Sequence, residues 1–124
     1  KVISDIEYIH EQGWMIKVID KSILIRRLKY LSRKLEQFTE QNEKIAEKIK
    51  NTEENFKIND KTKQKIIEEF NDQLEKNAEN RQKMINHSLD LLQKRVDTIK
   101  RKNRINQDGY DIIINDINYL RINL

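Results

Sequence analysis

The chain has 124 residues, 36% hydrophobic and 37% charged, with a formal net charge of +4 at pH 7. This composition favours an extended helical protein of one domain over a globular one with a thick core. The chain has no cysteine, which excludes disulfides, thiol catalysis and cysteine-based zinc sites. It also has no run of 18 apolar residues, so the sequence predicts no transmembrane span. Because the first residue is Lys1 rather than Met, we expect a piece of a longer or processed protein.

The first predicted element is a short helix within residues 1–13. Val2, Ile6 and Ile9 recur at helical spacing, and Gly13 separates this segment from the rest of the chain.

The stretch Trp14–Ile25 that follows is the most apolar part of the sequence. Its apolar side chains cover too much of a helix circumference for one two-stranded contact. We expect the terminal helices to cover it, or else a partner protein that docks there. The predicted docking residues are Trp14, Met15, Ile16, Ile19, Ile23, Ile113, Ile117 and Leu120.

A narrow seam at steps of three and four residues then runs through most of the chain, which predicts a coiled-coil helix over 14–105. Asn42 and Asn59 stand in this seam, where an Asn facing another Asn would fix the register between two helices. The seam residues expected at an oligomer interface are Leu28, Leu31, Leu35, Phe38, Asn42, Ile45, Ile49, Phe56, Ile66, Phe70, Leu74, Ile85, Leu89, Leu92, Val96 and Ile99.

Two interpretations of this long element remain. One continuous helix is preferred, because Ile49, Phe56 and Phe70 are separated by whole heptads. The alternative is an antiparallel hairpin turning near Asn59–Thr62, with Asp60 or Thr62 as a helix cap. That register would pair Leu28 with Ile99. It would also bring two basic clusters together at one end, which counts against it.

The last predicted element is a short helix within residues 106–124, after a turn at Asn106–Gly109. The fold class is therefore all-α: a long coiled-coil helix with short terminal helices.

Basic side chains form two clusters that could bind anions such as phosphates, acidic protein tails or lipid headgroups. A solvated helix face, with Lys and Arg stems over the seam's flanks, is the simpler interpretation. The cluster residues are Arg26, Arg27, Lys29, Arg33, Lys34, Lys94, Arg95, Lys100, Arg101, Lys102 and Arg104.

The sequence predicts no catalytic residues, no cofactor and no metal site. Glu7 and His10 have the Glu-x-x-His spacing of di-iron bundles, but the second motif that such a site needs is missing around His87.

These patterns favour a structural or scaffolding protein that associates through helices with itself or with another subunit. The alternatives are an accessory subunit that binds nucleic acid or another polyanion, and a regulatory subunit that docks an enzyme through Trp14–Ile25. An intracellular, cytoskeletal setting would suit a long rod.

Overall fold

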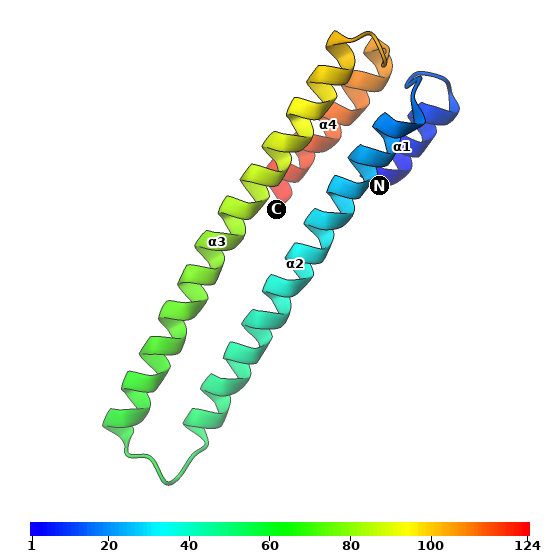
Figure 1. The fold of residues 1–124 in the computed structure, drawn as a ribbon. Helices are drawn as coiled ribbons and strands as arrows, with labels where there is room; N and C mark the ends of the chain where they lie inside the picture. The colour runs from blue at the N-terminus through cyan, green and yellow to red at the C-terminus, as the bar shows by residue number, and fades with distance from the viewer. The chain divides into compact units, whose positions relative to one another are not determined.

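The computed structural model describes all residues 1–124, and the chain is all-α, as the sequence predicts (Figure 1). Its helices are α1 (Val2–Glu11), α2 (Val18–Glu53), α3 (Asp60–Arg101) and α4 (Gln107–Asn123). They form two compact units. The larger unit contains residues 1–32 and 84–124, and the smaller unit contains residues 33–83.

The preferred prediction of one continuous helix over 14–105 is wrong, and the hairpin alternative is correct. Residues 54–59 form a loop in which the Asn55 side-chain oxygen accepts a hydrogen bond from the Lys57 N–H (3.0 Å). Asn59 caps α3 by accepting from the Thr62 N–H (2.8 Å), in place of the predicted caps.

Phe56 explains why the heptad argument failed. It lies in the loop and is 99% exposed, so it belongs to no helical seam. Its whole-heptad distances from Ile49 and Phe70 are therefore a coincidence of spacing.

The smaller unit, residues 33–83, is a helical hairpin with a thin core. Ile45 is buried, and the other apolar seam residues are half-buried: Leu35, Phe38, Ile49, Ile66, Phe70 and Leu74. Asn42 does face another Asn, because the Asn77 amide donates to its side-chain oxygen (3.3 Å). The register that pairs Leu28 with Ile99 would have placed Asn42 opposite Ile85. The observed partner lies about two helical turns earlier in α3.

The larger unit, residues 1–32 and 84–124, contains the main core. Figure 1 shows α1 beside the first part of α2 and α4 beside the last part of α3. All four helices and the segments between them contribute buried apolar side chains. They are Ile6, Ile9, Met15, Leu24, Leu28, Leu31, Ile85, Leu89, Leu92, Val96, Ile99, Ile105, Ile113 and Ile117.

The two connections in this unit are joined by backbone hydrogen bonds. The Ile16 N–H donates to the Arg104 carbonyl (2.9 Å), and the Asn106 N–H donates to the Trp14 carbonyl (2.8 Å). Asn103, which follows α3, adopts the left-handed conformation (φ 56°), which Asn tolerates better than most residues.

The predicted turn at Asn106–Gly109 is instead the first turn of α4. Asn106 caps this helix by accepting a hydrogen bond from the Gly109 N–H (2.8 Å). A β-carbon at Gly109 would lie 2.9 Å from the Ile9 side chain, so glycine allows the close approach of α1 and α4.

Truncating the α3 core should destabilise the larger unit. Leu89 is fully buried, and we expect Leu89→Ala to lower the free energy of unfolding by about 2–5 kcal/mol through lost burial and a cavity. Ile122→Ala, at a position 84% exposed, is the control and should change it by less than about 0.5 kcal/mol. Urea unfolding measures both, and equal effects would contradict the described core.

A buried carboxyl in α4 also makes stability depend on pH. Burial of Asp116, together with the neighbouring Asp5 carboxyl on α1, raises the pKa of Asp116 to about 6 from the usual 3.8. Lys1 opposes this shift only in part. The folded state therefore binds this proton more tightly than the unfolded state does, so the resulting stability is lost as pH rises towards 6.

We expect the free energy of unfolding to fall by about 1–2 kcal/mol between pH 3.8 and about 6, and Asp116→Asn to remove most of this decrease. Urea unfolding at stepped pH measures it. Asp72→Asn, at an exposed position in the smaller unit, is the control that keeps the parent slope. A parent-like slope in Asp116→Asn would contradict the assignment.

Candidate anion-binding groove

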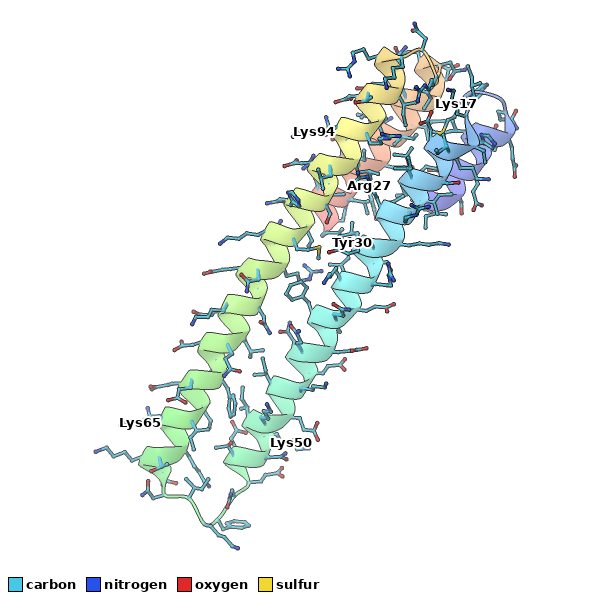
Figure 2. All side chains as sticks on the ribbon, in the orientation of Figure 1. Lys17, Arg27, Tyr30, Lys50, Lys65 and Lys94 are labelled. Atoms are coloured by element: carbon cyan, nitrogen blue, oxygen red, sulfur yellow. The ribbon has the colours of Figure 1, made fainter.

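A half-open groove of about 540 Å³ lies between α2 and α3 in the larger unit. Its lining combines cations with apolar and hydroxyl groups and contains no carboxylate. The lining residues are Ile23, Arg26, Arg27 and Tyr30 of α2, and His87, Ser88, Leu91 and Arg95 of α3. Figure 2 shows Arg27 and Tyr30 on the stretch of α2 that runs beside α3.

The groove and α4 lie on different sides of α3. The Arg121 guanidinium of α4 contacts Asp90 (2.8 Å), and the Tyr110 hydroxyl of α4 donates to Asp97 (2.7 Å). On a helix of 3.6 residues per turn, Asp90 and Asp97 are about 130° from the face that carries Leu91 and Arg95. The side of α3 that lines the groove is therefore left uncovered by α4.

Arg95 is positioned by a buried carboxylate. Asp20, in the first turn of α2, has a fully buried side chain. Its Oδ1 lies 3.6 Å from Arg95 Nη2 and 3.5 Å from Arg104 Nη1, while the two arginine side chains stay about one-third exposed. Two cations around one anion leave this part of the unit with a net positive charge.

Arg26 and Arg27 make no ion pair with the carboxylates of the chain. Both are exposed, and both line the groove beside the apolar Ile23. An arginine without an internal partner keeps its full capacity to bind a carboxylate or phosphate through two parallel hydrogen bonds. The arrangement can therefore bind an anionic group that also carries apolar atoms.

The fold brings together only part of the predicted anion contacts. Arg26, Arg27 and Arg95, from both clusters, share the groove, and Arg104 joins them through Asp20. Arg33 and Lys34 belong to the smaller unit. The remaining cations lie outside the groove lining: Lys29, Lys94, Lys100, Arg101 and Lys102.

Most of the predicted docking residues are used in internal packing. Met15, Ile113 and Ile117 are buried, and Trp14, Ile23 and Leu120 are half-buried. Ile16 and Ile19 remain exposed, and so does Val18 between them.

The sequence interpretation missed Asp20, which organises the arginines, and the contributions of His87 and Ser88 to the groove. A signal for Asp20 was present, because it lies four residues before the buried Leu24 and so on the same helical face. An acid that is buried on an apolar face needs a cation beside it.

No group of three His, Cys, Asp or Glu side chains lies close enough together to hold a metal ion. None of the helices combines the length and apolar character needed to cross a membrane.

Comparison with protein-family models gave no match, and neither the curated proteins nor the solved structures contain a match to this chain.

The buried ion cluster gives a direct test of this geometry. Asp20→Asn should lower the free energy of unfolding by about 1–3 kcal/mol, because both guanidinium groups lose their partner while staying partly hydrated. Asp90→Asn removes the exposed ion pair with Arg121 and should lower it by less than about 1 kcal/mol. Thermal or urea unfolding compares the two variants. A larger effect at Asp90 would contradict the assigned role of Asp20.

Proposed function

We propose that this chain is a non-catalytic helical adaptor, a subunit of a larger assembly, that binds an acidic segment of a partner protein in the groove between α2 and α3. The observation that carries the proposal is the lining itself: Arg26, Arg27 and Arg95 beside apolar walls, with no carboxylate among the lining residues.

The mixed lining supports a protein ligand over a nucleic acid. Ile23 and Leu91 contribute apolar surface next to the arginines, which suits a peptide with both acidic and apolar side chains. Of the aromatic residues only Tyr30 lies in the groove, whereas single-stranded nucleic acids are bound by stacking on several aromatic rings.

The same packing argues against the predicted homo-oligomer seam as the main interface. In the larger unit the strongest seam residues are already buried inside the chain, among them Leu28, Leu89 and Leu92. A second copy is not needed to cover them. Association with a partner therefore requires a different surface, and the groove provides one.

The test is fluorescence anisotropy with a fluorescein-labelled peptide rich in Glu and Leu, beside a Lys–Leu peptide and an oligothymidylate. We expect binding of the Glu–Leu peptide that weakens with added salt. Arg26→Glu with Arg27→Glu should weaken it by about tenfold or more, because attraction becomes repulsion.

The matched control is Lys44→Glu with Lys65→Glu, which makes the same charge change at exposed positions of the smaller unit (Lys65 is labelled in Figure 2). It should change the affinity by less than about twofold. Equal losses in both double variants, or no binding of the Glu–Leu peptide, would overturn the proposal. Tighter, groove-dependent binding of the oligothymidylate would replace it with nucleic-acid binding.

A further inference from the structure

The side chains that border the groove follow coiled-coil spacing on both helices. On each helix, the four side chains along one edge of the groove follow one another at intervals of four, three and four residues. The α2 edge consists of Ile19, Ile23, Arg26 and Tyr30, and the α3 edge of Met84, Ser88, Leu91 and Arg95. Six of these eight side chains line the groove, and Ile19 and Met84 extend its two edges by one turn.

This spacing aligns each set on a narrow face of its helix. At 100° per residue, the four positions of either set fall within about 60° of the helix circumference. The buried face of α2, which carries Leu24 and Leu28, is centred about 130° away. Each helix therefore has a second seam besides the one that forms the core, and this second seam is open to solvent along the groove.

From this geometry we propose that the occupant of the groove is a single amphipathic helix of a partner protein, with a heptad repeat of apolar residues flanked by Asp or Glu. The inference rests on the proposed function and specifies the conformation and sequence pattern of its ligand. Two parallel edges with heptad spacing match the pattern in which a third helix inserts its side chains between two others.

Apolar contact supports a helix with an apolar stripe. Ile19 is 58% exposed on the same face as Ile23, and withdrawing an isoleucine from water on binding stabilises a complex. Leu91 faces the groove from the other helix and is half-buried. A partner helix lying along both edges would cover these side chains together.

The positive charge of the groove argues against a second copy of this chain as its occupant. Arg26, Arg27 and Arg95 would need carboxylates opposite them, and the same face of a second copy has none. Two such faces would bring six guanidinium groups together, three from each copy. An acidic helix supplies the missing charge at the positions that flank its apolar stripe.

The experiment compares two labelled peptides of identical composition and about 21 residues, three heptads. In the first, Leu occupies the heptad a and d positions with Glu beside them, so that repulsion between glutamates keeps the free peptide monomeric. In the second, the same residues are ordered without the three- and four-residue spacing. We expect the heptad peptide to bind about tenfold or more tightly and to gain helix on binding, measured by circular dichroism.

A double variant tests the contribution of the apolar contact to binding separately from that of the charge. Ile19→Asn with Ile23→Asn should weaken binding of the heptad peptide by about tenfold and leave the shuffled peptide's affinity nearly unchanged. Ile122→Asn, at a solvent-exposed position of α4, is the control and should leave both affinities unchanged. Circular dichroism of each free variant checks that the bundle is intact.

The outcomes distinguish the two proposals. If both peptides bind equally and lose affinity in the arginine double variant, the acidic ligand stands and the helix is overturned. If neither peptide binds, both proposals fail. If only the heptad peptide binds and the Ile19 and Ile23 substitutions weaken it, the helix is supported.

Discussion

The Asp20 carboxylate is fully buried near the start of α2, and its Oδ1 lies within 3.6 Å of the guanidinium groups of Arg95 and Arg104. Removing a carboxylate from water is unfavourable unless cations replace the lost hydration. Asp20 therefore requires the end of α3 to lie against the start of α2. The hydrogen bond from the Ile16 N–H to the Arg104 carbonyl joins the same two segments. This ion cluster also holds Arg95 at the edge of the groove, so the larger unit and its candidate site depend on one residue.

The ion cluster of Asp20, Arg95 and Arg104 also explains how the hairpin can hold two groups of basic side chains at one end. Two basic clusters at one end of a hairpin repel each other unless a counter-charge lies between them. In the structure Asp20 lies between the arginines, and electrostatic energy depends on the nearest charges more than on totals. Among the cations that line the groove, Arg26 and Arg27 have no internal carboxylate partner, and the anionic ligand is proposed to bind there.

Periodicity in the sequence predicts a good part of this fold. The all-α class, the terminal helices and the buried positions from Ile85 to Ile99 all follow from helical spacing, because one helical face must be withdrawn from water. The turn at residues 54–59 does not follow, since Phe56 keeps heptad spacing while lying in the loop. The decisive features there are the side-chain hydrogen bonds of Asn55 and Asn59, which act over two or three residues. In a chain rich in Asn, such local signals are indistinguishable from background.

The sequence pattern does not predict the groove either, for a different reason. Its edges combine two isoleucines, two arginines and a tyrosine with serine, methionine and leucine, so neither an apolar pattern nor a charge pattern reveals them. Only the pairing of α2 with α3 shows that both sets have the same spacing and border the same groove. Placing arginine in a seam is unfavourable for a helix that must bury the seam to fold, because the charge would lose its hydration. The same arginine is useful in a seam that stays open until a partner brings the opposite charge. The core seam of the larger unit accordingly has apolar residues along α3, and the cations are found in the seam that faces solvent.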